Sequence, residues 1–208
     1  MPKGELKGEL FLLRHGETDW AVAGRHTGRS DIPLNSTGEA AARARRPKLA
    51  AKTFALVLAS PLQRARSTAE LALEGSKADI QIDADLAEWD YGAFEGLTTH
   101  EIREQLGDAS WLVWDRPITP GAAKPGEQLA DVAVRAKRVI DRVTQTLLDG
   151  QDVLLVAHGH LLRILTAVWL GLEPRAGCFF ALSAAGLSVL GFERKQPVIV
   201  RWNTPLSE

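Results

Sequence analysis

The hydrophobic residues of this chain fall into short continuous apolar runs, separated by longer stretches in which apolar positions recur with a helical period. A short apolar run bounded by turn signals is typical of a buried strand. Runs of this kind lie at residues 10–13, 54–59, 80–82 and 152–157. The clearest helical period covers residues 127–148, where arginines dominate the face opposite the apolar positions. Strands that alternate with helices predict an α/β fold of three α/β/α layers, with a mostly parallel sheet in the middle.

Local signals predict where the other helices begin and end. Helices are expected over residues 37–52, 61–73, 98–106 and 161–170. Thr98 and Glu101 have the spacing of a capping box, which favours a helix beginning there. Ser60 suits an N-cap and Pro61 the first helical position that follows it. Pro47 should end or kink the helix in which it lies.

The C-terminal part of the chain has three further apolar runs, at residues 178–182, 187–192 and 198–202. Short turns separate them, which favours antiparallel neighbours. We therefore expect an antiparallel hairpin at the edge of the sheet. The length suits a single domain over residues 1–208, with a core over about 9–202.

Composition narrows the classes of protein that the chain can represent. Hydrophobic residues make up 45% and charged residues 25%, as in ordinary globular proteins. The net charge of −1 argues against nucleic acid or an acidic membrane surface as a partner. Cys178 is the single cysteine, so an intramolecular disulfide is excluded, and its apolar surroundings predict a core position. No apolar leader or 18-residue apolar stretch is present, so we expect a cytoplasmic protein.

Two of the predicted strands end in a histidine followed by glycine. Arg14, His15 and Gly16 follow the run at 10–13, and His158 follows the run at 152–157, 143 residues after His15. That separation suits two adjacent parallel strands joined by crossovers, whose carboxyl ends bind ligands in open α/β sheets. A neutral imidazole is a nucleophile, and a guanidinium is a natural partner of a phosphate or a carboxylate.

Two further residues have the chemistry of an anion-binding catalytic site. Arg64 falls in the first turn of a predicted helix, where the helix dipole favours a bound anion. Glu88 lies among aromatic residues and glycines, a setting in which a carboxyl group can be partly desolvated. Asp90 and Glu95 are the other acids of this segment.

Four segments, in this order along the chain, resemble the histidine phosphatase superfamily, the phosphoglycerate-mutase-like proteins. They read RHGET at 14–18, SPLQRARSTAE at 60–70, EWDYGAFEGLT at 88–98 and AHGH at 157–160. The resemblance covers about residues 10–171. The residues of these motifs are similar to those of bacterial acid phosphatases and of bisphosphatases that act on sedoheptulose bisphosphate.

The resemblance implies a role for each of these residues. His15 would attack phosphorus and carry a phosphoryl group, while Arg14 and Arg64 bind its oxygens. A protonated His158 would add positive charge where charge develops. Glu88, two residues before the Asp-Tyr-Gly, would act as the general acid and then as the base for water.

The same resemblance assigns phosphate or substrate contacts to Thr27, Gly28, Tyr91 and Gly159. For His26 we leave open either a substrate contact or a place in a polar loop. We expect Glu17 to orient loops by hydrogen bonding and His100 to be exposed to solvent. His160 is expected to support the site from beside it. The chain has neither a cysteine pair nor a His-Glu-x-x-His motif, so we expect no metal and no cofactor.

Residues 98–127 are expected to cover the site. Trp111 and Trp114 are spaced for one helical face and could pack in the core or over the entrance. Arg29, Arg116 and Lys124 could supply charge to the leaving group. Which of these side chains contact it stays open at this point.

Three functions are compatible with these residues. The first is a phosphatase that hydrolyses small phosphate monoesters such as sugar phosphates; the others are a cofactor-dependent phosphoglycerate mutase and a non-catalytic protein that binds phosphorylated ligands. Mutases of the family carry Glu-Arg-His-Tyr-Gly, whereas this chain has Trp89 and Asp90 in place of the arginine and histidine. The loss of positive charge favours the phosphatase. The physiological substrate stays open, as does a possible homodimer.

Overall fold

A computed structural model describes residues 8–116, 118 and 125–206 of the chain. Its strands form one six-stranded sheet in the order β3-β2-β4-β1-β5-β6. The strands are β1 (Leu10–Arg14), β2 (Phe54–Ala59), β3 (Ile80–Ile82), β4 (Asp152–Ala157), β5 (Leu187–Glu193) and β6 (Gln196–Thr204). The first four are parallel, while β5 runs antiparallel to β1 and β6 antiparallel to β5. The predicted mostly parallel sheet with an antiparallel edge is therefore confirmed.

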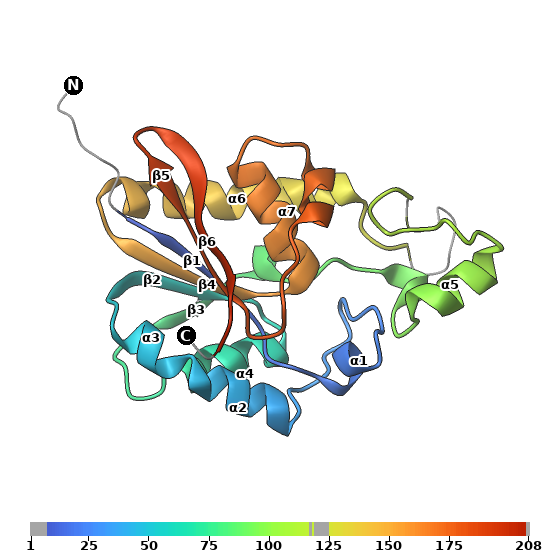
Figure 1. Cartoon of the computed structure of the whole chain (residues 1–208), viewed down its shortest axis with the longest axis horizontal. Helices are drawn as coiled ribbons and strands as arrows, with labels where there is room; N and C mark the ends of the chain where they lie inside the picture. Colours follow the sequence, from blue (N-terminus) through green and yellow to red (C-terminus); the bar gives the residue numbers. More distant parts are fainter. Residues whose placement is uncertain (1–7, 117, 119–124, 207–208) are drawn as a thin grey trace.

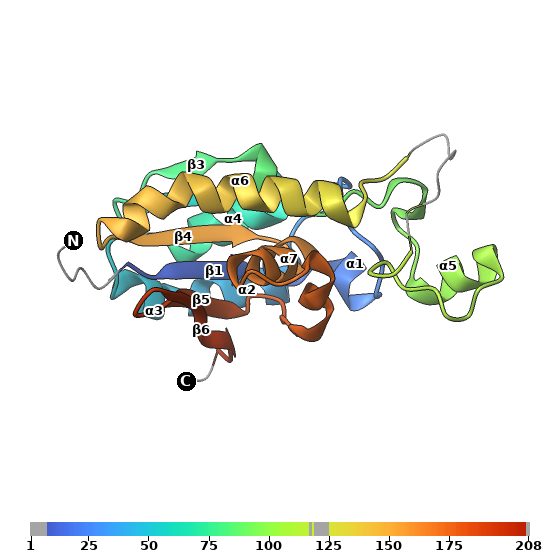
Figure 2. The ribbon, with the colours of Figure 1, turned by 90° about the horizontal axis from the view of Figure 1, so that it is seen from above.

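Helices cover both faces of this sheet, as the sequence predicts (Figures 1 and 2). The α-helices are α1 (Asp19–Val22), α2 (Ser36–Ala44), α3 (Arg46–Ala50), α4 (Gln63–Ala72), α5 (Thr99–Leu106), α6 (Leu129–Leu148) and α7 (Gly159–Trp169). Three 3-10 helices, η1 (Ala84–Leu86), η2 (Gly92–Phe94) and η3 (Pro174–Phe179), complete the described elements. Helices α6 and α7 lie on one face and α2, α3 and α4 on the other, whereas α1 and α5 lie beyond the carboxyl ends of the parallel strands. None of the helices in the described ranges is both long and apolar enough to cross a membrane.

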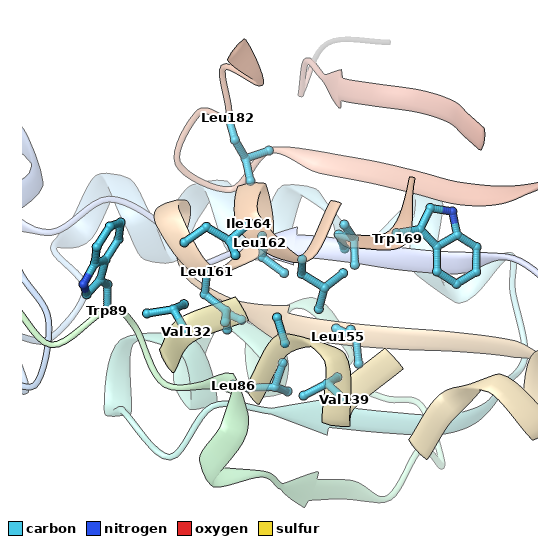
Figure 3. Close-up of a cluster of buried hydrophobic side chains, with 14 of the residues drawn as sticks. Leu86, Trp89, Val132, Val139, Leu155, Leu161, Leu162, Ile164, Trp169 and Leu182 are labelled. Atoms are coloured by element: carbon cyan, nitrogen blue, oxygen red, sulfur yellow. The ribbon is translucent and has the colours of Figure 1, made fainter. Parts of the chain in front are cut away.

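The two faces of the sheet have separate cores, which explains the continuous apolar runs. In β1, Leu10 and Leu12 belong to the core under α6 and α7, while Phe11 and Leu13 belong to the core on the other face. Successive side chains of a strand point to opposite faces, so a strand buried on both sides needs apolar residues at every position. Figure 3 shows the first core, with Leu155 of β4 among side chains of α6 and α7.

The predicted helix over 37–52 is interrupted by a buried arginine. Arg45 separates α2 from α3, and Pro47 lies in the first turn of α3, where a missing N–H is tolerated. The Arg45 guanidinium donates to the carbonyls of Ala185 (2.7 Å), Thr204 (2.6 Å) and Pro205 (2.9 Å). The break between α2 and α3 therefore lets Arg45 bind the C-terminal segments.

The predicted strand over 178–182 was wrong. Cys178 lies in η3 and is partly buried, so its predicted core position is only partly reached. The side chain of Arg163 in α7 donates to the carbonyls of Gly177 (3.0 Å) and Cys178 (2.9 Å). These bonds hold the segment against α7, whereas a strand would need those carbonyls for a ladder.

Candidate active site

The two histidines that end predicted strands lie side by side in the structure. His15 follows β1 and His158 follows β4; the two strands are adjacent and parallel, with Arg14 opposite Ala157. The ring centroids of the two histidines lie 5.1 Å apart. The prediction of two neighbouring strand-end imidazoles is confirmed.

The surroundings of His15 make its imidazole a neutral nucleophile. Nδ1 donates to the carbonyl of Gly16 at 2.7 Å, and since a carbonyl only accepts, Nδ1 carries the proton. Nε2 then has the free lone pair. Burial lowers the pKa of His15 well below 6.5, and the charges of Arg14 and Arg64 lower it further. The ring is therefore neutral at physiological pH.

Two buried guanidinium groups are fixed by backbone carbonyls. Arg64 in α4 donates through its terminal nitrogens to the carbonyls of Thr27 (3.0 Å), Gly28 (2.9 Å) and Ser30 (2.8 Å). Arg14 donates to the carbonyl of Leu182 at 2.5 Å. Burial lowers the pKa of both arginines. Both cations are thus held at fixed positions before any ligand binds.

Buried nitrogen atoms without a partner gather at this place. In the described residues, four buried side-chain nitrogen or oxygen atoms have no hydrogen-bond partner, and three of them are Arg14 Nε, Arg64 Nε and His158 Nδ1. Buried polar groups in proteins are almost always hydrogen-bonded. Their gathering around the neighbouring rings of His15 and His158 indicates a site for an anion with several acceptor oxygens.

His158 is held by a residue to which the sequence analysis gave a different role. Its Nε2 lies 2.7 Å from the hydroxyl of Ser60, whose oxygen also accepts the backbone N–H of Leu62 at 3.3 Å. Leu62 is the N-cap residue of α4. The prediction of Ser60 as the helix N-cap was wrong, since α4 begins at Gln63. Burial, Arg64 and His15 lower the pKa of His158 well below 6.5, so the free site holds a neutral ring instead of the expected cation. A bound phosphoryl dianion would raise that pKa by charge attraction.

Glu88 is buried beside the histidines and is oriented by backbone amides. Its carboxylate accepts N–H groups from Trp89 (2.9 Å), His160 (3.0 Å) and Leu161 (2.9 Å), two of which belong to the first turn of α7. Among the described residues that line the cavity, Glu88 is the one carboxylate. The carboxyl group is therefore buried, as expected, and points to the same space as His15.

The other two acids of this segment support backbone structure. Asp90 accepts the N–H of Gly92 at 2.8 Å. Glu95 accepts backbone N–H groups of Gly28 (3.1 Å), Ser30 (3.2 Å) and two further residues, Arg29 and Tyr91. Arg64 donates to carbonyls of the same loop. Glu95 therefore helps to fix the position of Arg64 by ordering that loop.

A buried ion pair, Arg135 with Glu127, binds the backbone on both sides of Glu88. Arg135 in α6 is only 4% exposed, although the helical period predicts a solvent-facing arginine. It binds both carboxylate oxygens of Glu127 (2.8 and 3.0 Å) and donates to the carbonyls of Asp85 and Ala87. Glu127 in turn accepts the N–H of Asp90 at 3.0 Å. The backbone before and after Glu88 is thus anchored to one pair.

A cavity of about 340 Å³ opens at this end of the sheet. Of the predicted site residues, it is lined by Arg14, His15, Thr27, Glu88, Tyr91 and Gly159. Arg64, His158 and Gly28 are not among the lining residues. Both backbone groups of Gly28 are bonded within the protein, its N–H to Glu95 and its carbonyl to Arg64. Gly28 therefore supports the wall of the cavity. A larger cavity, of about 590 Å³, lies away from these residues, between α3 and the end of α4.

Aromatic and imidazole rings form the other wall of the cavity. The Tyr91 hydroxyl lies 2.6 Å from His160 Nδ1, and the His26 ring lies 4.8 Å from the Tyr91 ring. The Trp114 ring packs 5.0 Å from His160. His26 and Trp114 therefore line the cavity, while Trp111 is buried 5.4 Å from Phe94. Residues 113–115 form a turn, so Trp111 and Trp114 do not lie on one face of a helix.

The remaining predicted residues lie away from the cavity or outside the described part of the chain. Arg29 pairs with Asp90 and Glu127, and Arg116 with Asp108. Glu17 accepts a bond from Asn35, as expected of a residue that orients loops, and His100 is exposed to solvent. Lys124 lies outside the described residues. Two arginines of the cavity, Arg25 and Arg163, were not predicted from the sequence; the placement of Arg163 one helical turn beyond Gly159 was the available signal.

Acidification should destabilise the fold through the buried histidines. Below pH 6.5 the unfolded chain takes up a proton on His15 and on His158, whereas the folded chain does not until a lower pH. The free energy of unfolding should therefore fall by about 1.4 kcal/mol per pH unit for each of these rings. Urea unfolding between pH 7.5 and 5.5 without phosphate measures the slope. His158→Asn should reduce it and His100→Asn should leave it unchanged; equal slopes in all three proteins would contradict the assignment.

The fold and the site together define a class of enzyme. A neutral strand-end histidine near two arginines, with a second histidine and a buried carboxyl group beside it, has the chemistry that transfer of a phosphoryl group through nitrogen requires. The sequence model of the histidine phosphatase superfamily (branch 1) matches residues 10–205. The chain belongs to this superfamily, and its fold is the phosphoglycerate-mutase-like α/β fold.

Known relatives include phosphatases from distant organisms. An acid phosphatase of Mycobacterium tuberculosis is 38% identical over 88% of this chain and 86% of its own length. A sedoheptulose 1,7-bisphosphatase of Saccharomyces cerevisiae is 33% identical over 83% of this chain and 71% of its own length. The solved structure of the product of open reading frame Rv3214 from Mycobacterium tuberculosis has a TM-score of 0.85 at 35% identity, covering 96% of this chain and 98% of that one. The similarity to acid phosphatases and sedoheptulose bisphosphatases is confirmed, and phosphoglycerate mutases are also among the relatives.

Proposed function

We propose that the protein is a phosphatase that hydrolyses small phosphate monoesters through a phosphohistidine on His15. The observation that carries the proposal is the group of buried, unpartnered nitrogens of Arg14, Arg64 and His158 near the reactive ring. Three donors at fixed positions match the charge that spreads over the equatorial oxygens during phosphoryl transfer. Such an arrangement supports a transferred phosphoryl group better than a surface that only binds phosphorylated ligands.

In the first step, Nε2 of His15 forms a bond to phosphorus and the phosphorus–oxygen ester bond breaks. Glu88, protonated, gives its proton to the leaving oxygen, so an alcohol departs and a carboxylate remains. The positive charge that develops on the imidazole is stabilised by the Nδ1–H bond to the carbonyl of Gly16. In the second step, Glu88 takes a proton from water, the water oxygen attacks phosphorus and the nitrogen–phosphorus bond breaks. Inorganic phosphate leaves and the neutral His15 is restored.

The positions that carry positive charge in mutases have other tasks in this chain. The indole nitrogen of Trp89 donates to the carbonyl of Glu127 at 2.8 Å, and the ring packs at one end of the core shown in Figure 3. Asp90 caps the turn at Gly92. Neither side chain lines the cavity. A mutase must hold a bisphosphorylated intermediate while it reorients, which needs cations at these positions; without them the alcohol should leave and water should enter.

The proposal predicts hydrolysis without interconversion of phosphoglycerates. We expect the purified protein to release phosphate from p-nitrophenyl phosphate and from a panel of sugar phosphates, at unchanged rate in EDTA, since arginines supply the positive charge. 3-Phosphoglycerate should not be converted to 2-phosphoglycerate, with or without 2,3-bisphosphoglycerate. Efficient interconversion would instead establish a mutase. Binding of phosphorylated compounds without turnover at any pH from 4 to 8 would establish a non-catalytic relative.

A further inference from the structure

Arg163 adds a cation to the cavity that phosphoryl transfer through His15 does not use. It lines the cavity together with Glu88 and His15. In α7 it follows Gly159 by four residues, about one helical turn or 5.4 Å along the axis. Gly159 packs against the Arg14 side chain, since a Cβ atom there would lie 3.3 Å from Arg14 Nε. Arg163 is therefore displaced by about one turn from the place where the phosphoryl group binds, on the side of the ring-lined wall.

The guanidinium of Arg163 is fixed in place on two sides. Its Nε and Nη2 donate to the carbonyls of Gly177 (3.0 Å) and Cys178 (2.9 Å). Its planar face lies over the ring of Trp114, with the central carbon 4.6 Å from the ring centroid. These contacts use two of the three nitrogens, and no acceptor among the described residues is bonded to Nη1. A cation that is immobilised in advance loses little entropy when it binds an anion.

The charge of Arg163 is not balanced by an acid close to it. Within the described ranges, no carboxylate oxygen lies within 4.0 Å of its nitrogens, whereas Arg25, the other arginine of this wall, lies 3.7 Å from Glu101. Arg163 is partly buried, and burial lowers its pKa, an effect that attraction by Glu88 partly offsets. Partly buried cations in proteins are normally paired. Glu88 is engaged by three backbone N–H groups and does not supply that partner.

We propose that Arg163 recognises a second anionic group, a carboxylate or a second phosphate, on the alcohol that leaves from the substrate. The proposal rests on the phosphatase function and names the substrate class: small phosphate monoesters with an acidic group a few bonds from the ester oxygen. Phosphate at His15 and the acid at Arg163 would place the ester oxygen between them, on the side of Glu88. The neutral rings of Tyr91 and His160 would contact the carbon skeleton between the two acidic groups.

Two matched pairs of substrates test this assignment and distinguish the two anions. 3-Phosphoglycerate and glycerol 3-phosphate differ in a carboxylate; fructose 1,6-bisphosphate and fructose 6-phosphate differ in a second phosphate. The wild-type protein should prefer the more acidic member of at least one pair, by about 10- to 100-fold in kcat/KM, as expected for a charge-assisted hydrogen bond. Arg163→Met should abolish that preference and change hydrolysis of p-nitrophenyl phosphate by no more than about threefold. Arg163→Lys, which keeps the charge, should retain part of the preference and covers the case in which Arg163→Met does not fold.

Arg25→Met is the matched control, because it removes a cavity arginine that already has an acidic partner. It should leave most of the preference in place. Equal losses in Arg25→Met and Arg163→Met would assign the preference to the total charge of the cavity and overturn the proposal. So would a wild-type protein that hydrolyses p-nitrophenyl phosphate yet shows no preference in either pair. Absence of p-nitrophenyl phosphate hydrolysis would instead overturn the phosphatase function.

Discussion

Replacement of His15 by alanine should reduce phosphatase activity by about 10⁴-fold or more, because the nitrogen that would accept the phosphoryl group is lost. Brief incubation of the wild-type protein with a ³²P-labelled monoester, followed by denaturation, should trap label that is stable in alkali and lost in acid, as a phosphoramidate is. His15→Ala should show no such label. Labelling of comparable amount in the variant would show that another residue is the nucleophile.

The fold should survive this substitution. His15 follows β1, and its side chain makes its hydrogen bond to the neighbouring Gly16 carbonyl, so its removal breaks no hydrogen bond between distant elements of the described structure. Thermal unfolding above pH 7 should be close to that of the wild type. His100→Ala is a suitable control, since that side chain is 80% exposed. It should change neither the labelling nor the rate.

Glu88→Gln should slow hydrolysis of alkyl phosphates by about 10²- to 10⁴-fold, the usual contribution of a general acid. Hydrolysis of p-nitrophenyl phosphate should fall much less, by about tenfold at most, since p-nitrophenolate leaves without a proton. Comparison of kcat for glycerol 3-phosphate and p-nitrophenyl phosphate measures the difference. A structural role would lower both rates equally, because the defect would be in the folded site and not in proton transfer.

Glu95→Gln separates the two roles further. Glu95 also accepts several backbone N–H groups, but its own side chain does not line the cavity. Its replacement should affect both substrates alike, through the loop that fixes Arg64. A dependence on the leaving group in Glu95→Gln, and none in Glu88→Gln, would exchange the two assignments.

Much of the site could be predicted because its candidate residues directly follow apolar runs that are recognisable as strands. His15 and His158 follow apolar runs, and parallel strands bring their carboxyl ends together, so adjacency followed from topology. Ser60 was misassigned because a serine before a helix has the same local sequence whether it caps that helix or contacts a histidine from another strand. Which contact forms depends on β4, 98 residues further along the chain. Local patterns cannot give that information.

Long-range partners also explain the other differences. The helical period places Arg135 on the polar face of α6, yet the carbonyls of Asp85 and Ala87 and the carboxylate of Glu127 bury it. The apolar segment around Cys178 has the composition of a strand, but its carbonyls are bonded to Arg163. In both cases an arginine side chain binds backbone groups that would otherwise need water or a ladder. Both differences between prediction and structure therefore involve arginines. Their long side chains contact segments that the periodicity of their own helix does not reveal.

The ion pair of Arg135 and Glu127 holds the segment of Glu88 in place by contacts outside the cavity. It anchors the backbone around Glu88 to α6, so the acid has a support apart from Leu112 and Val113, which supply another part of the cavity wall. Substrate preference and catalytic geometry thus have separate supports. For protein engineering, Leu112 and Val113 are the place for a combinatorial library, since the accepted alcohol can be varied there while Trp114, which packs against Trp89 and Arg163, is kept.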